Sequence, residues 1–380
     1  MDRTSARATT ADRPAVTELR LSSYRLHRGA AFPLGPMTVF AGPSGSGKSS
    51  ALEAYEALSR LGGGASLEEV FPDAAACVPE QARPDAQRRR GFRIGCTVEG
   101  PAGQVRLDVA VQAEPELRVV GERLTGNGQI LLATALRDPG RRTVQAAWHT
   151  AGSVPVTRAP LPDDRLGTTL LPLRVAGTTE GQRLVLAAAE QAVVALRSVF
   201  ACDPQPERMR APVAAGEGRL RGGCGNLAEV LQRIRSECAT RHAALVAASR
   251  AGCAGVVEDL AAQELADGTV RAVLDRGGLG TTPVGRLGDG ELRYLALALV
   301  LLTGPGVLAM EPVAEVLPAR QALTVLADGF DRCLDRCQSR ELLALAVRMG
   351  ERGHVRLVGA VREAADAAGV EGVSVVDLGV

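Results

Sequence analysis

The sequence predicts an α/β fold with a mostly parallel core sheet, an antiparallel β lobe and an inserted helical lid. Three patterns support this prediction. Short apolar runs alternate with helical spacing through residues 266–380, as in a parallel sheet covered by helices. Strict alternation over residues 92–98 and 105–111, on either side of a Gly-Pro-Ala-Gly turn, predicts an antiparallel hairpin. Helical spacing over residues 179–200, and again after Asn226, predicts the long helices of the lid.

The remaining elements follow from the same kind of spacing. Leu19 and Leu21, then Phe32 and Leu34, predict two strands before a short apolar strand at 37–40. Further strands are expected at 117–120, 144–148, 269–274, 307–310, 355–358 and 373–378, and helices at 48–61, 292–302 and 319–333. These elements divide the chain into a disordered arm (1–15), the first part of the core (16–64), an antiparallel β lobe with connector (65–175), a helical lid (176–265) and the second part of the core (266–380).

Charge and composition exclude some function classes. The 380 residues include 44 Lys and Arg against 43 Asp and Glu, so no global field attracts the chain to nucleic acid or an anionic membrane. Any such contact must be a local patch, and the arginine run 88–90 is expected to be solvated charge. Aromatic residues make up only 3%, so base-stacking surfaces are scarce. All basic residues are arginine except one, Lys48.

The sequence predicts a cytoplasmic protein with reduced thiols. Residues 1–14 contain no apolar signal segment, and the longest apolar stretch, 295–302, is far shorter than the roughly 20 residues that span a bilayer. The eight cysteines include no Cys-x-x-Cys pair and suggest no zinc site. Cys333 and Cys337, one helical turn apart, are expected at small apolar core positions.

The first motif with a clear chemistry is a glycine-rich loop between a predicted strand and a predicted helix. It reads Gly42, Pro43, Ser44, Gly45, Ser46, Gly47, Lys48 and Ser49, and it fits G-x-x-x-x-G-K-[ST]. In such a loop the backbone N–H groups surround phosphates, the lysine reaches the β- and γ-phosphates, and the hydroxyl of Ser49 would ligate Mg²⁺. Lys48 occupies the one position where the planar guanidinium of arginine does not replace a point charge.

A second glycine-rich segment precedes the apolar helix predicted at 292–302. It reads Leu287, Gly288, Asp289, Gly290 and Glu291, and the apolar run 307–310 then ends in Glu311 and Pro312. With these motifs the chain resembles the ABC-type ATPases of the SMC/RecF class, in particular the short-lidded AAA-family or RecF-like group. The resemblance extends over most of the chain.

The resemblance implies ATP and Mg²⁺ as cofactors. The loop residues, together with Ser50, would bind the nucleotide, and Ser49 would ligate the metal. Residues 287–291 resemble the signature, which caps the γ-phosphate bound by the opposite subunit in an ATP-dependent homodimer. Glu311 matches the catalytic carboxylate that orients the attacking water. Without the resemblance, residues 288–290 could be an ordinary turn and Glu311 a solvated acid.

Three positions depart from the family pattern. Gly288 replaces the signature serine, Met310 replaces the Walker B acid, and Val361 or Arg362 stands where the switch histidine is expected. The loss of one preorganised electrostatic group costs about 3 kcal/mol of barrier. Slow hydrolysis, or none, is therefore expected.

Two functions stay open from the sequence. The first is an ATPase whose ATP-dependent dimerisation acts in DNA maintenance or defence. The alternative is a non-hydrolysing ATP sensor that acts through a protein partner, and a small-molecule kinase fits less well because the signature-like segment would need a separate explanation. The sequence identifies neither a DNA nor a protein partner, and the metal-sensing glutamine could be Gln81, Gln104 or Gln112.

Overall fold

The computed structural model describes residues 13–150, 155–310 and 321–379. This part of the chain forms two compact units. The first holds the described residues up to Leu34 together with Gly45–Val199. The second holds Gly35–Ser44, the residues from Phe200 to 310 and those from Leu323 onward. Glu311 lies outside the described residues, and the five sequence-based boundaries remain predictions.

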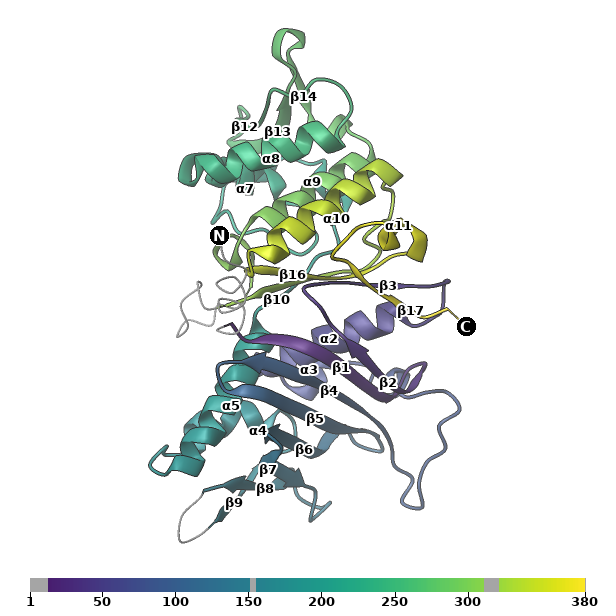
Figure 1. Ribbon diagram of the computed structural model, residues 1–380, viewed down its shortest axis with the longest axis vertical. Helices are drawn as coiled ribbons and strands as arrows, with labels where there is room; N and C mark the ends of the chain where they lie inside the picture. The colour runs from purple at the N-terminus through teal and green to yellow at the C-terminus, as the bar shows by residue number, and fades with distance from the viewer. Residues whose placement is uncertain (1–12, 151–154, 311–320, 380) are drawn as a thin grey trace. The chain divides into compact units, whose positions relative to one another are not determined.

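The first unit is built on an antiparallel sheet of eight strands, in the order β2-β1-β4-β5-β6-β7-β8-β9 (Figure 1). The strands are β1 (Ala15–Tyr24), β2 (His27–Pro33), β4 (Arg90–Gly100), β5 (Gly103–Glu114), β6 (Arg118–Gly126), β7 (Gln129–Ala135), β8 (Thr143–His149) and β9 (Val156–Pro162). The predicted hairpin is β4–β5, with Val98 opposite Val105. The predicted antiparallel lobe is thus confirmed.

Helices pack on one face of this sheet. They are α2 (Lys48–Gly62), α3 (Leu67–Val70), α4 (Gly167–Arg174) and α5 (Glu180–Arg197), with a 3-10 turn η1 (Ala75–Cys77). Because side chains alternate between the two faces of a strand, Val105, Leu107 and Val109 are buried where α5 contacts β5. The intervening side chains of Arg106 and Asp108 therefore lie on the opposite face.

The second unit contains the parallel sheet that the sequence predicts. Its order is β10 (Val199–Ala201), β15 (Leu323–Ala327), β16 (Val355–Ala360), β3 (Met37–Ala41) and β17 (Ser374–Asp377). The last four strands run parallel to their neighbours. Every residue of β3, β15 and β16 is buried, which explains why these strands are mostly apolar rather than alternating, with Thr38, Thr324 and Arg356 as the buried polar residues. The helices α10 (Arg336–Glu351) and α11 (Ala364–Ala368) pack on β3.

The rest of the second unit consists of helices and a small sheet. The sheet holds β11 (Val213–Ala214), β13 (Thr269–Asp275), β12 (Asp259–Glu264) and β14 (Thr281–Pro283). The helices are α6 (Pro206–Met209), α7 (Leu227–Glu237), α8 (Ala239–Gly252) and α9 (Asp289–Leu302), with 3-10 turns η2 (Gly277–Leu279), η3 (Val284–Arg286) and η4 (Pro305–Val307). Helix α9 contacts α8 and α10 and is buried from Leu292 to Leu301, which explains its nearly uniform apolar sequence.

Three predictions about the C-terminal part are wrong. Residues 307–310 form no strand: Val307 is the last residue of η4, and Leu308 makes a single bridge to Leu220. The core strand is β15, which lies inside the segment 319–333 that the spacing predicts as a helix. A short, fully buried apolar run has no periodicity that separates strand from helix. Cys333 and Cys337 are exposed rather than core residues, although all eight cysteines are free, as predicted.

Candidate nucleotide-binding site

The glycine-rich loop, residues 42–49, has the backbone that its sequence predicts. Gly42, Gly45 and Gly47 have φ angles of 141°, 83° and 97°, in the region that favours glycine. The loop follows β3, and Gly47 is the N-cap of α2, whose first residue is Lys48. The first N–H groups of a helix have no partner within the helix, and the dipole is positive at that end. The loop therefore has the features of an anion site.

His27, at the start of β2, supports this loop. Its Nε2 lies 3.0 Å from the carbonyl oxygen of Gly47, and the side chain is buried. A Cβ on Gly47 would lie 2.8 Å from two atoms of the imidazole ring. Glycine is therefore required at position 47 for two reasons: its positive φ angle and the close approach of the His27 ring. No motif in the sequence points to His27, because the contact is made by a residue of a different strand.

The polar side chains of the loop fit a phosphate ligand. The Oγ of Ser46 is buried and has no hydrogen-bond partner among the described residues. Buried hydroxyl groups in native proteins are normally paired, so this one fits an acceptor such as a phosphate oxygen. Lys48 is half-buried at the start of α2, and the side chain of Ser49 is exposed. Ser50 is buried.

The carboxyl ends of the parallel strands bring a further acid to the edge where the loop leaves β3. Strands β15, β16 and β17 run in the same direction as β3, and ligands of open α/β sheets bind outside the carboxyl ends of such strands. Asp328 follows β15 directly, is half-buried, and makes no hydrogen bond or ion pair with any described residue. In the sequence, the run Leu-Thr-Val-Leu-Ala-Asp at 323–328 could have indicated a strand followed by an acid. The prediction of a helix over 319–333 excluded that interpretation.

A buried arginine of α9 holds the turn that follows Asp328. The Nη2 of Arg293 donates to the carbonyl oxygen of Gly329 at 3.0 Å, and its Nη1 donates to Asp203 Oδ1 at 3.0 Å. The same Nη1 also donates to the carbonyl oxygen of Pro204 at 2.6 Å. Arg293 is only 2% exposed, so these bonds compensate for burying its charge. The helix after the signature-like segment is therefore tied to the carboxyl ends of both β10 and β15.

The signature-like segment forms a capped helix start. Gly288 is the N-cap of α9, and its N–H donates to Glu291 Oε2 at 3.0 Å. The other oxygen of Glu291 accepts a hydrogen bond from the N–H of Ala254 at 2.9 Å. Both carboxylate oxygens of Glu291 are thus engaged within the protein, so this side chain orders the turn.

The remaining residues of this segment are also fixed. Asp289 forms an ion pair with Arg210, whose Nη1 also donates to the carbonyl oxygen of Leu287 at 3.1 Å. A Cβ on Gly290 would lie 2.3 Å from the carbonyl oxygen of Cys333, so only glycine fits there. The five predicted signature residues therefore form one ordered turn. Their relation to the glycine-rich loop of another protomer stays a prediction.

The three candidate glutamines have different surroundings. Gln104, near the start of β5, donates a hydrogen bond to Glu99. Gln112, near the end of β5, donates one to the carbonyl oxygen of Glu116. Gln81 accepts a hydrogen bond from Arg28 Nη2 at 2.8 Å. Arg28 follows His27, so Gln81 is the glutamine that lies near the strand supporting the glycine-rich loop.

Comparison with known proteins identifies the architecture. No family model and no curated protein matches the chain. An SMC head bound to the C-winged helix domain of ScpA is 12% identical, with 94% of this chain and 93% of that chain covered and a TM-score of 0.53. This chain has the fold of an SMC head domain. A second SMC head, with an extended coiled coil and bound to the C-terminal domain of ScpA from Pyrococcus furiosus, is 10% identical, with 95% and 92% covered and a TM-score of 0.50.

The SMC-head fold confirms the predicted combination of a parallel and an antiparallel sheet, while the finer RecF-like assignment stays a prediction. Among the described residues, no helix is both long and apolar enough to cross a membrane. Nor do three or more His, Cys, Asp or Glu side chains gather there in a way that could hold a metal ion by themselves. A metal that bound here with a nucleotide would therefore need oxygen ligands from phosphates as well, as Mg²⁺ commonly does.

Proposed function

We propose that this SMC-head-like chain binds ATP with Mg²⁺ through residues 42–49. The observation that carries the proposal is the loop itself, in which three glycines with positive φ lead into α2 at Lys48. Its N–H groups and the ammonium of Lys48 would bind the phosphates, and Ser49 would ligate the metal. The unpartnered hydroxyl of Ser46 supports this role.

Asp328 is proposed as the acid that supports the metal. In P-loop proteins Mg²⁺ is held by the loop Ser or Thr and by an acid that follows a core strand. Asp328 follows β15, and it has no partner among the described residues that would compete for its carboxylate. Residues 307–310 form no strand, which supports Asp328 rather than position 310 as the proposed place of the metal-supporting acid.

The site supports nucleotide binding better than fast hydrolysis. Gly329, rather than a carboxylate, follows Asp328, and Gly288 provides no side-chain hydroxyl at the N-cap of α9. Val361 is buried after β16 and has no side chain that titrates. Glu311 lies outside the described residues, and because residues 307–310 form no strand, its role as the catalytic carboxylate stays a prediction from the sequence resemblance alone. We therefore propose slow ATP hydrolysis as the first candidate function. A non-hydrolysing ATP sensor is the second candidate, because Gly329 provides no carboxylate after Asp328.

Nucleotide-dependent self-association is the proposed output. Residues 287–291 form an ordered helix start, and α9 begins with N–H groups suited to an anion. A second protomer would supply the phosphate that this segment caps. The related SMC heads were solved with a domain of ScpA bound, so a protein partner is proposed beside DNA.

Binding is tested by calorimetry with magnesium and a non-hydrolysable ATP analogue. The wild type should release heat, and Lys48→Ala should weaken binding at least tenfold. Arg60→Ala is the matched control because Arg60 is exposed near the other end of α2. No heat with the wild type, or equal affinity in Lys48→Ala, would overturn the proposal.

Steady-state ATPase measurements separate the two candidates. Turnover that is abolished in Glu311→Gln supports the enzyme, whereas wild-type turnover equal to the background, with binding intact, supports the sensor. Asp328→Asn should weaken binding in the presence of magnesium and leave metal-free binding unchanged. Light scattering with and without ATP then shows whether Lys48→Ala prevents dimerisation.

A further inference from the structure

Two buried cysteines of the second unit lie side by side. The Sγ atoms of Cys202 and Cys224 are 3.8 Å apart, and both residues are buried. Backbone hydrogen bonds hold their segments together. The N–H of Asp203 donates to the carbonyl oxygen of Gly222 at 3.0 Å, and the N–H of Cys202 donates to that of Leu326 in β15 at 2.8 Å. The backbone therefore keeps the two thiols together, although 22 positions of sequence separate them.

The backbone conformation of Cys224 supports a role for its sulfur. Cys224 has a φ angle of 56°, in the left-handed region that residues other than glycine seldom adopt. Its neighbours Gly222, Gly223 and Gly225 are all glycines, and a further glycine at position 224 would adopt this conformation without cost. Residues held in such a conformation are typical of functional positions. The φ angle therefore argues against Cys224 as an ordinary core residue.

The charge next to the pair comes from a buried arginine. Arg293 is 2% exposed, and its Nε has no hydrogen-bond partner among the described residues. The hydrogen bond with Cys202, together with burial, raises the pKa of Cys224 well above its usual value, and the positive charge of Arg293 offsets this only in part. Cys224 therefore keeps its proton and donates it toward Cys202. A thiolate at Cys202 would have this donor and a positive charge nearby.

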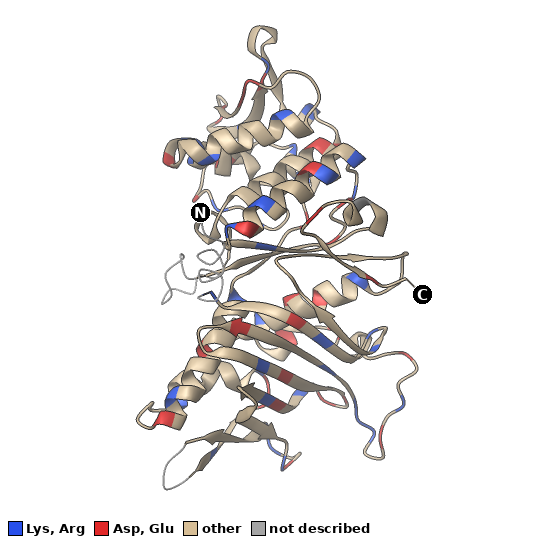
Figure 2. Ribbon diagram, in the orientation of Figure 1, with Lys and Arg blue, Asp and Glu red and all other residues tan. Residues whose placement is uncertain are grey.

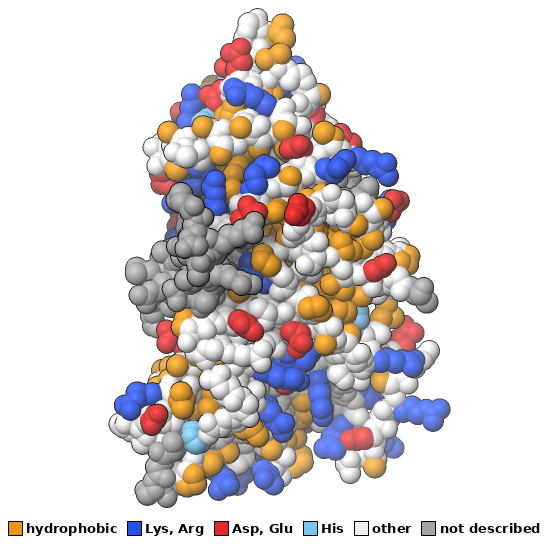
Figure 3. Space-filling view, in the orientation of Figure 1, with side chains coloured by type: hydrophobic (Ala, Val, Ile, Leu, Met, Phe, Trp, Pro, Cys, Tyr) orange, Lys and Arg blue, Asp and Glu red, His pale blue; other side chains and the backbone are white. Residues whose placement is uncertain are grey.

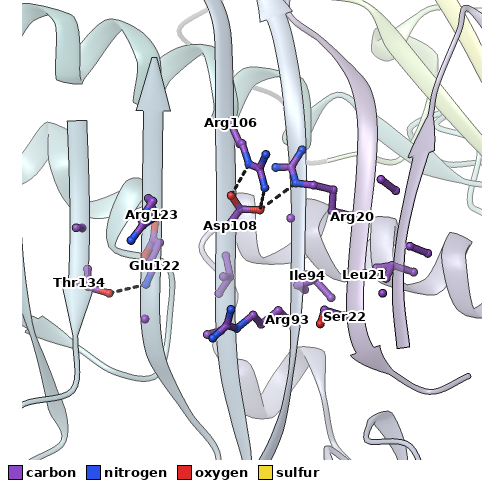
Figure 4. Close-up of a pocket in the computed structure, with 18 residues that line it drawn as sticks. Arg20, Leu21, Ser22, Arg93, Ile94, Arg106, Asp108, Glu122, Arg123 and Thr134 are labelled. Carbon is purple, nitrogen blue, oxygen red and sulfur yellow. Dashed lines mark hydrogen bonds and ion pairs between the residues drawn. The ribbon is translucent and has the colours of Figure 1, made fainter. Parts of the chain in front are cut away.

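Arg293 differs from the arginines at the surface. Water and salt screen charges that face solvent, whereas a buried charge acts on its neighbours with little screening. A groove of about 650 Å³ on the uncovered face of the antiparallel sheet is lined by arginines from four adjacent strands: Arg20, Arg93, Arg106 and Arg123 (Figure 4). Figures 2 and 3 show further charged side chains, with both signs interspersed over the face that is drawn. Burial is therefore what lets Arg293 stabilise a thiolate at the pair.

The pair lies one residue below the surface. The side chain of Asp203, next to Cys202, is 47% exposed, and Gly223, next to Cys224, is half-buried. Local opening of such a segment would admit a small neutral oxidant such as hydrogen peroxide. A metal ion fits the pair less well, because no three His, Cys, Asp or Glu side chains gather in the described part of the chain.

From this geometry we propose that Cys202 and Cys224 form a reversible disulfide when the chain meets a peroxide. The thiolate of Cys202 attacks one oxygen of hydrogen peroxide, the O–O bond breaks, and the leaving hydroxide takes up the thiol proton to give water. Cys224 then attacks the sulfenic sulfur of Cys202, the S–O bond breaks, and a second water leaves with the proton of Cys224. The two thiols lose two electrons, and one peroxide is reduced to two waters.

The disulfide would alter the hydrogen bonds of Arg293. A disulfide bond is about 2.05 Å long, so the two sulfur atoms must approach each other by about 1.8 Å. Asp203, next to Cys202, accepts a hydrogen bond from Arg293 at 3.0 Å, and Arg293 also holds Gly329, which follows Asp328. This step rests on the proposed function: a shift of the turn after Asp328 would weaken the binding of ATP with Mg²⁺.

The first test counts thiols in the double variant Cys333→Ser with Cys337→Ser, which removes the two exposed cysteines and leaves six. The native protein is treated with hydrogen peroxide, the excess is destroyed with catalase, and thiols are titrated in guanidinium chloride. The count should fall from six to four and return to six after dithiothreitol. Peptide mass spectrometry of the oxidised wild type should show residues 202 and 224 linked, with the loss of two hydrogens.

Further variants on the same background identify the sulfur atoms involved. Cys202→Ala and Cys224→Ala should each abolish the loss of thiols that dithiothreitol reverses. The matched control is Cys96→Ala, which removes a buried thiol from the first unit and should still show the loss of two thiols. Because the linked peptide is sought in the wild type as well, the test does not depend on the folding of any variant.

Three results would overturn the proposal: a count that stays at six, a link between any other two cysteines, or the same reversible loss in Cys202→Ala. Calorimetry with magnesium and the ATP analogue then compares reduced with oxidised protein, and the oxidised sample should bind about threefold more weakly. Equal affinity would refute the connection to the nucleotide site. No binding by either sample would refute the proposed function instead, and the thiol count would still decide whether the disulfide forms.

Discussion

The Nε2 of His27 lies 3.0 Å from the carbonyl oxygen of Gly47, the residue that caps α2 just before Lys48. This bond joins β2 to the glycine-rich loop across 20 positions of sequence. The imidazole also occupies the space that any larger residue at position 47 would need. The loop is therefore held in place by a side chain that belongs to no nucleotide-binding motif.

His27→Ala should weaken ATP-analogue binding about five- to tenfold. The reason is that one hydrogen bond, worth about 1 kcal/mol, no longer fixes the loop. Calorimetry with magnesium measures the affinity, and His149→Ala on β8 serves as the control because His149 is bonded to Gln129 instead. Unchanged affinity in His27→Ala would show that the loop does not need this support.

Arg293→Lys should lower the free energy of unfolding by about 3 kcal/mol. A lysine ammonium has no planar fork with which to reach Asp203, Pro204 and Gly329 together, and hydrogen bonds to charged groups contribute about 1.5–3 kcal/mol each. Urea unfolding followed by circular dichroism measures the change. Arg332→Lys is the control: Arg332 is half exposed and 3.7 Å from Asp203, so its loss should cost less than about 1 kcal/mol. Similar losses in both variants would contradict this account.

Glu122 should make stability fall as the pH rises. Burial raises the pKa of its carboxyl group, and the hydrogen bonds from Thr168 and Gly167 offset this only in part. A raised pKa in the folded state means that stability is complete below the unfolded pKa and is lost as the pH rises through the folded value. The unfolding free energy of the wild type minus that of Glu122→Gln should therefore be more positive at pH 4.5 than at pH 8. Glu80→Gln, at an exposed position, should show no such trend.

Cys333 and Cys337 should be the first thiols to react in the native protein. Both are exposed, whereas burial raises the pKa of Cys96 and of Cys253 to about 12, which keeps those thiols protonated. Titration with a chromogenic disulfide at pH 8 should give a fast phase of two thiols. The phase should disappear in the double variant Cys333→Ser with Cys337→Ser. A fast phase that persists there would contradict the expectation that the six remaining cysteines, five of them buried and Cys238 half-buried, react more slowly.

Local patterns predicted a large part of this protein. The strand-loop-helix context of Lys48 and the β4–β5 hairpin follow from glycine spacing and from side-chain alternation, which act over a few neighbouring residues. The position of the core strand did not follow, because a buried parallel strand has no periodicity that distinguishes it from a buried helix. Asp328 was hidden for the same reason.

The sequence by itself determined the glycine-rich loop, the placement of its single lysine and the pairing of the antiparallel hairpin. Only the tertiary structure decided that His27 supports Gly47, that Asp328 follows a strand parallel to β3, and that arginines from four strands share one groove. The physical reason is the distance along the sequence over which each preference acts. Turn and strand preferences depend on adjacent residues, whereas these three relationships depend on which strands become neighbours in a sheet.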